Sequence, residues 1–323
     1  MPCHTIVHRQ DWFLEESYRA RTDREELGFL ERSFELHFNE RPFLNHFSYL
    51  FITRTTKERM RQQSNFSVLC RGHILPREVR DKDGVLRFLE AVEQFERIIR
   101  DSGLVRLERL TTEEITGKGK EAGLVEKYFS LSQEDTTTLE DIRLGGAEMR
   151  IGDKRLSVHT LSDADDLPAA VRTDGRYEKY STDRSDCRLS FAAPVGLMLP
   201  HNHICNLYVF IDDPAETLRN FEKAARNMRS LSRYSRANEI NRQWTEEYLN
   251  EAHSFGLVPV RCHCNVMAWS EDRERLRNIR NDTGSALAQM GCKPRHNTVD
   301  APTLYWAAIP GGEGDFPAEE SFH

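Results

Sequence analysis

The stretch Asn206-Leu-Tyr-Val-Phe-Ile211 decides the fold class, because β-branched and aromatic residues dominate it and predict a strand. A second strand is expected over Val258-Pro-Val-Arg-Cys-His-Cys-Asn-Val-Met-Ala-Trp269. Between them, Asp213-Pro214 precedes apolar residues at helical spacing, which predict two long helices near 214–255. Paired helices between two strands favour an α+β fold with mixed, largely antiparallel sheets and packed helices over uniform crossovers.

Each predicted helix of this pair carries an apolar stripe. The stripes hold Leu218, Phe221, Ala225 and Met228 in the first helix, and Ile240, Trp244 and Tyr248 in the second. Because an apolar stripe on a helix normally faces a core, we expect Trp244 to be buried.

The sequence on either side of the deciding stretch extends the pattern. Upstream, Cys187, Leu189 and Phe191 alternate with polar residues, and Pro194-Val-Gly turns the chain toward Leu197-Met-Leu199, which predicts an antiparallel hairpin or meander. Downstream, Ser270-Glu-Asp272 precedes a predicted helix over 271–290, which Gly291 ends.

The first part of the chain predicts a helix between two strands. Apolar residues recur at helical spacing from Val85 to Ile99, with Phe95 on the expected core face and Gly103 as the stop. Ser48-Tyr-Leu-Phe-Ile-Thr53 and Leu104-Val-Arg-Leu107 are the predicted strands.

A polar stretch near the middle predicts the domain boundary. Ser132-Gln-Glu-Asp-Thr-Thr-Thr-Leu-Glu-Asp141 lacks apolar periodicity, and Gly145-Gly146 follows it. We therefore expect two α+β subdomains, over 1–140 and 141–323, which the length of 323 residues accommodates.

Composition narrows the functional class. The 45 basic and 52 acidic side chains nearly cancel, so no global attraction to nucleic acid follows. Seven scattered cysteines do not form the dense pattern of a secreted disulfide scaffold, which favours a reducing compartment. The start lacks signal-peptide character, and no window approaches the roughly 20 apolar residues needed to cross a bilayer.

A nucleotide site is not expected in this chain. A P-loop needs Gly-x-x-x-x-Gly-Lys-Ser/Thr, because its backbone N–H groups and lysine hold the phosphates. The nearest sequence, Gly117-Lys-Gly-Lys120, lacks the first glycine and the hydroxyl residue, and we interpret it as a loop.

His201, His203, Cys205, Cys262 and Cys264 form a candidate zinc or cysteine-nucleophile cluster. Thiolates and imidazoles suit zinc, and alternate strand residues share a face, so four ligands could converge if the two strands were neighbours. The alternative interpretation is ordinary core packing, since free cysteines on strands are often core residues.

A basic face is predicted on the paired helices. Between Arg219 and Arg242 the sequence has seven basic residues against Glu222 and Glu239. The candidate partner or nucleic-acid face consists of Arg219, Lys223, Arg226, Arg229, Arg233 and Arg236. Such a face could hold phosphates or an acidic partner, but it could also be a solvated helix surface.

Seven short motifs are spread along the chain: Gln10-Asp-Trp-Phe13, Phe38-Asn-Glu-Arg-Pro-Phe43, Phe95-Glu-Arg-Ile-Ile-Arg-Asp-Ser-Gly103, Tyr180-Ser-Thr-Asp-Arg184, Leu231-Ser-Arg-Tyr-Ser-Arg236, Ser285-Ala-Leu-Ala-Gln-Met290 and Trp306-Ala-Ala-Ile-Pro310. Together, and in the same order from about residue 8 to residue 317, they resemble the N-terminal region of the TraG family of Bacteroides-type conjugative transposons.

The resemblance implies a part of the ATPase that energises a type IV secretion system at the cytoplasmic face of the inner membrane. Members of the family carry the site for ATP and magnesium in a C-terminal P-loop domain, which this sequence does not contain, so no catalytic residue is carried over. This chain is expected to be a non-catalytic assembly and docking region that contacts other conjugation proteins and takes part in oligomerisation. A nucleic-acid-binding module is the alternative, and a zinc or cysteine site is a further one.

Overall fold

The computed structural model describes residues 3–16, 28–39, 43–56, 81–133, 141–143, 148–161, 166–168, 170–171, 175–178, 181–196, 198–232 and 234–316. Within them the fold is α+β, as predicted, and its centre is a largely antiparallel eight-stranded sheet. Its path runs β2 (Phe43–Thr56), β1 (Cys3–Glu16), β8 (His203–Ile211), β9 (Val260–Ser270), β5 (Lys154–Leu161), β4 (Arg150–Ile151) and β3 (Ile142–Arg143), and β10 (Arg295–Asn297) also pairs with β5.

Strands from both sides of residue 140 make up this sheet. β1 pairs along its length with β2, and its other edge pairs with β8, with Thr5 opposite Ile211 and Phe13 opposite His203. The boundary that we expected at residue 140 therefore does not divide the sheet. Residues 134–140 and the Gly145-Gly146 pair lie outside the described residues.

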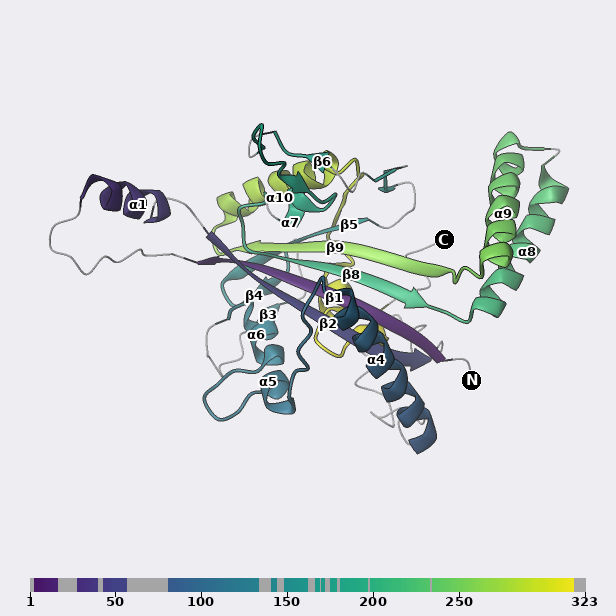
Figure 1. The fold of residues 1–323 in the computed structure, drawn as a ribbon, viewed down its shortest axis with the longest axis horizontal. Coiled ribbons are helices and arrows are strands. Elements are labelled where there is room, and N and C mark those ends of the chain that lie inside the picture. Colours follow the sequence, from purple (N-terminus) through teal and green to yellow (C-terminus); the bar gives the residue numbers. More distant parts are fainter. Residues whose placement is uncertain are drawn as a thin grey trace.

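Helices lie on both faces of the sheet and at its end (Figure 1). The described helices are α1 (Phe29–Asn39), α4 (Lys82–Ser102), α5 (Thr112–Thr116), α6 (Leu124–Ser130), α7 (Ala193–Gly196), α8 (Pro214–Leu231), α9 (Arg236–Phe255), α10 (Arg273–Gln289) and α11 (Ala301–Ala307), with a 3-10 turn η3 (Glu313–Asp315). A separate small sheet pairs β6 (Gly175–Arg176) with β7 (Arg188–Leu189).

The larger core lies between the sheet and the helices α6 and α11. Trp12, Tyr208 and Met267 point from the strands to Tyr128 of α6 and Tyr305 of α11, and all five side chains are fully buried. The hydroxyl of Tyr128 donates to the Tyr305 carbonyl at 2.8 Å. Burial of such large side chains removes much apolar area from water.

A smaller core lies on the opposite face, beneath α10 and α7. Leu161, Val266 and Leu287 are its central residues, with Val195, Ala286 and Cys292 beside them. α10 begins at the side chain of Asp272, which accepts from the backbone N–H of Glu274, close to the start that the sequence predicts. This core covers one half of that face of the sheet.

Several predicted elements are confirmed and some are wrong. The strands at 48–53, 206–211 and 258–269 and the helices at 85–99, 214–255 and 271–290 are present. Leu104–Leu107 is not a strand, because it follows the left-handed Gly103 cap and has no strand partner among the described residues.

The sequence also predicted an antiparallel hairpin or meander from Cys187 toward Asn206–Ile211, and this prediction is wrong. Pro194-Val-Gly belongs to the short helix α7, and Leu189 pairs with Gly175 rather than with β8. Met198 and Leu199 are not in a strand. β8 has β1 and β9 as its neighbours, so its partners come from distant parts of the sequence.

The expected burial of Trp244 and Phe95 is wrong as well. Trp244 is 65% exposed and Phe95 is 36% exposed. The apolar stripes exist, but α4 has no buried residue and α9 turns Trp244 away from its contact with α8. An apolar stripe predicts which side of a helix is apolar, but it does not predict whether another element covers that side.

Candidate functional site

The helix pair α8–α9 projects from one end of the sheet (Figure 1). The two helices pack mainly against each other, with Ala225, Leu249 and Ala252 buried between them. Phe221 and Tyr248 meet edge to face at 5.5 Å. Most of the surface of this hairpin is therefore available for contacts with another molecule.

The base of the hairpin is held by polar contacts. Asp213 caps α8, since its side chain accepts from the backbone N–H groups of Ala215 and Glu216. Its neighbour Asp212 accepts from the Arg261 guanidinium at 2.8 Å and lies 2.5 Å from Nδ1 of His4. Burial alone would raise the pKa of Asp212, but these hydrogen bonds outweigh it and lower the pKa to about 2.

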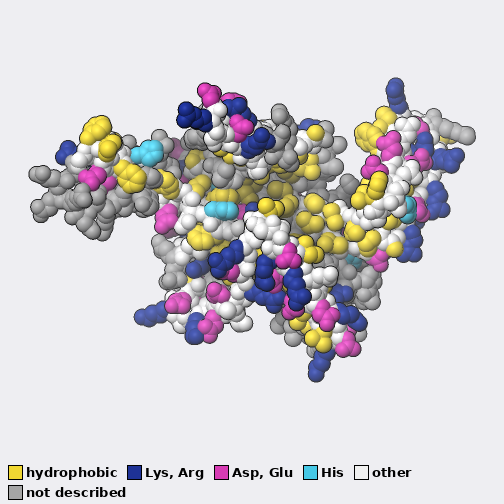
Figure 2. Space-filling view, viewed as in Figure 1, with side chains coloured by type: hydrophobic (Ala, Val, Ile, Leu, Met, Phe, Trp, Pro, Cys, Tyr) yellow, Lys and Arg dark blue, Asp and Glu magenta, His cyan; other side chains and the backbone are white. Residues whose placement is uncertain are grey.

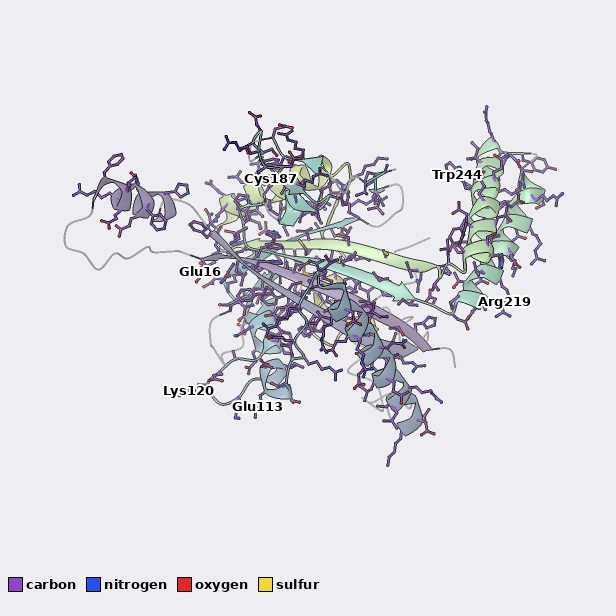
Figure 3. The ribbon with its side chains drawn as sticks, in the orientation of Figure 1. Glu16, Glu113, Lys120, Cys187, Arg219 and Trp244 are labelled. Atoms are coloured by element: carbon purple, nitrogen blue, oxygen red, sulfur yellow. The ribbon has the colours of Figure 1, made fainter. Side chains whose placement is uncertain are left out.

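Four of the six predicted basic residues share the outer face of α8. Arg219, Lys223, Arg226 and Arg229 are exposed at spacings of four, three and three residues, and they make no ion pair with any described residue. Figure 2 shows Lys and Arg along the side of the hairpin that is turned away from the sheet, and Figure 3 places Arg219 on that side. We call these four residues the basic face.

Among the described residues, the other cations of this region belong to α9 and not to α8. Arg236 is the first residue of α9, and Arg233 lies outside the described residues. Arg242 is neutralised by Glu239 at 2.6 Å and Glu246 at 2.5 Å. The local excess of charge is thus concentrated on α8.

The side of α9 that carries Trp244 has a row of apolar residues. Helical spacing places Ile240 and Phe255 on the same side, with Glu247 and Glu251 between them, and Trp244 and Phe255 are 65% and 77% exposed. Tryptophan and phenylalanine that are this exposed mark interaction surfaces more often than random positions do.

The predicted zinc cluster does not assemble. β8 and β9 are neighbours, as the hypothesis required, but their register places His203 opposite Ala268 and Cys262 opposite Val209. His203 and Cys262 are thus six residues apart along the ladder, or roughly 20 Å. No group of three or more possible metal ligands is found among the described residues.

The two histidines of that cluster have other contacts. His203 is buried, stacks on Phe13 at 4.6 Å, and points its ring nitrogens at the carbonyls of His201 and Val195. Burial lowers its pKa to about 4, so the ring is neutral near pH 7 and donates to one of the two carbonyls. His201 contacts Asp282 at 2.8 Å.

The cysteines are poor candidates for a nucleophile. Burial raises the pKa of Cys205 and Cys262, and it raises the pKa of Cys264 to about 12. A thiol must ionise to attack, so none of the three is activated near neutral pH.

The glycine-rich sequence at Gly117 is a tight turn. Lys118 and Glu121 exchange backbone hydrogen bonds, and the ammonium of Lys118 lies 2.8 Å from Glu113. Gly117 and Gly119 have positive φ, which glycine adopts without strain. This geometry fits the loop interpretation.

A buried polar network on the core face of the sheet was missed by the sequence analysis. His8 directs Nδ1 to Glu313 at 3.1 Å and Nε2 to the side-chain oxygen of Asn206 at 2.9 Å. Glu313 also accepts from Thr53 at 2.8 Å, and Asn206 accepts from Gln10 at 3.0 Å. The network fastens the segment around η3 to three strands of the sheet. The polar residues His8 and Gln10 between Ile6 and Trp12 were the available signal, because all four share one face.

Among the described residues, no helix is both long and apolar enough to cross a membrane. No protein-family model matches the sequence, and no curated protein matches it.

Proposed function

We propose that this chain is a non-catalytic assembly and docking region of a conjugative DNA-transfer ATPase of the type IV secretion kind. The observation that carries the proposal is the α8–α9 hairpin, which offers exposed Trp244 and Phe255 on one side and the basic face on the other. Two chemically different surfaces on a protruding element suit contacts with other proteins.

The motifs that resemble the TraG family supply the biological setting of the proposal. In that setting, ATP and magnesium bind in a domain that follows this region. The region itself works in the cytoplasm at the inner membrane, held there by other secretion proteins. The absence of a P-loop from residues 1–323 agrees with this division of labour.

The first test separates catalysis from docking. ATP binding and hydrolysis are measured for residues 1–323 and for a longer chain that continues into the natural sequence after His323. We expect turnover in the longer chain alone. Turnover by residues 1–323 would contradict the non-catalytic assignment.

A nucleic-acid-binding role is the second candidate, because the four cations of the basic face make no ion pair within the described residues. If they hold a single strand, log K falls with log salt, and each lost phosphate contact lowers the slope by about 0.7. Arg226→Glu with Arg229→Glu should then flatten the slope, whereas Arg87→Glu on α4 should not. The same pair combined with Arg233→Glu extends the charge reversal to three of the six predicted residues. Equal slopes for all these variants would remove this candidate.

A further inference from the structure

One half of a sheet face carries apolar side chains that stay partly or largely exposed among the described residues, and Arg9, opposite Leu207, shares this face with them. Val7 lies opposite Ile52 of β2 and Val209 of β8, and Val209 lies opposite Cys262 of β9. Residues directly opposite each other in antiparallel strands share a face. Their chain neighbours, such as Ile6 and Tyr208, point to the other face and are fully buried there.

The helices α10 and α7 cover the other half of this same face, above Val266 and Leu161. Toward the hairpin this cover ends, and Leu207 and Val260 are 42% and 48% exposed. We call Val7, Ile52, Leu207, Val209 and Val260 the floor. Figure 2 shows hydrophobic side chains at the surface between the body of the molecule and the hairpin.

The hairpin presents a matching surface beside the floor. Ile240, Trp244 and Phe255 fall on one side of α9 by helical spacing, and Glu247 and Glu251 fall between them. We call these five residues the wall. In Figure 3, Trp244 points from α9 toward the side on which the sheet lies.

The charges around the two surfaces are complementary. Glu247 and Glu251 of the wall are exposed and make no ion pair with a described residue. Arg54, at the edge of the floor opposite Thr5, is likewise exposed and makes no ion pair with a described residue. A wall laid on a floor would bring apolar side chains together and place acidic groups near a cation.

The wall of a given molecule stands beside its own floor and not on it. The caps and ion pairs at the base, from Asp212 to Arg261 and from Asp213 to the start of α8, hold the hairpin in this position. A second molecule has no such restraint. An exchange of hairpins about a two-fold axis would cover both floors with identical contacts.

We propose that two copies of this chain associate by laying the wall of each on the floor of the other. This proposal rests on the proposed docking role of the hairpin and names its partner.

The test is sedimentation velocity over a concentration series of residues 1–323. Trp244→Glu alters the wall, Leu207→Glu alters the floor, and Leu86→Glu on α4 is the control, since all three residues are at least 42% exposed. We expect a concentration-dependent dimer whose dissociation constant rises at least about tenfold in the wall and floor variants and is unchanged in the control.

Mixing the two variants gives the decisive result. A heterodimer of the wall variant and the floor variant contains one intact wall on one intact floor, so association should partly return in the mixture. A chain that stays monomeric at every concentration, variants that dimerise like the wild type, or a mixture that stays as weak as its components would overturn the proposal.

A cross-linking experiment tests whether the wall of one molecule lies near the floor of the other. In Glu251→Cys, a flexible bismaleimide can join the new thiol to exposed Cys262, and Cys262→Ser is the control. A joined dimer that Cys262→Ser abolishes supports exchange, whereas the absence of any joined dimer at concentrations where the protein sediments as a dimer would contradict it. If residues 1–323 do not self-associate but hairpin variants still abolish DNA transfer, the dimer proposal fails and the proposed docking role remains.

Discussion

Removal of the Glu313 carboxylate should destabilise the whole protein. Glu313 is fully buried and accepts from His8 at 3.1 Å, from Thr53 at 2.8 Å and from the backbone N–H of Gly311 at 3.2 Å. Both ring nitrogens of His8 lie within hydrogen-bond distance of side-chain oxygens, and the ring is fully buried, so it depends on these partners.

The expected magnitude follows from breaking a buried pair at one partner. Glu313→Ala removes the acceptor that faces His8, Thr53 and the backbone N–H of Gly311, and at about 1–3 kcal/mol for each unsatisfied buried group we expect a loss of about 3–5 kcal/mol of unfolding free energy. Glu313→Gln keeps hydrogen-bonding atoms near Thr53 and Gly311, and we expect a smaller loss of about 1–3 kcal/mol.

Urea unfolding followed by tryptophan fluorescence measures these losses, because Trp12 and Trp269 are buried in the wild type. Glu271→Ala, on the exposed segment before α10, is the matched control and should stay within about 0.5 kcal/mol. If Glu313→Ala lost less than about 1 kcal/mol, the network would not fasten the C-terminal segment to the sheet.

Two further predictions concern stability. Trp244→Ala should change the unfolding free energy by less than about 0.5 kcal/mol, whereas Met267→Ala in the core should cost about 2–5 kcal/mol in the same urea titration; equal losses would mean that Trp244 is covered. Because the pKa of Asp212 is about 2 in the folded protein and 3.8 in the reference state, its contribution is fully present above about pH 4 and is lost as the pH falls toward 2. Asp212→Asn should therefore be less stable than the wild type by about 2 kcal/mol at pH 7 and equal to it at pH 2, and a difference that does not change with pH would refute the ion pair.

The periodicity of apolar residues predicted the long helices and strands, but not how the strands pair. The stripes of α8 and α9 and the apolar runs of β8 and β9 are long enough for periodicity to separate helix from strand. Leu104–Leu107 was too short for that distinction, and it pairs with no strand among the described residues. The pairing of β1 with β8 joins residues about 200 positions apart, which no local pattern encodes.

The candidate sites were likewise predictable where they depend on spacing within one helix and not where they depend on how strands pair. The basic face followed from helical spacing, so four of its residues lie together. The zinc hypothesis depended on strand register, which the sequence did not reveal, and the register keeps His203 far from Cys262. The floor had a signal that was not used, since β8 is apolar at both odd and even positions and so predicts a sheet covered on both faces.

The central claim is that the hairpin acts by docking within a DNA-transfer machine. The most direct test is the frequency of conjugative transfer from a donor whose own gene carries Trp244→Glu, together with ATP hydrolysis by the same full-length variant in solution. Leu86→Glu on α4 serves as the control. The account predicts that transfer falls by about two orders of magnitude or more, as for loss of an interface hot spot, while ATP turnover keeps its wild-type rate. Wild-type transfer by the Trp244→Glu donor would contradict it.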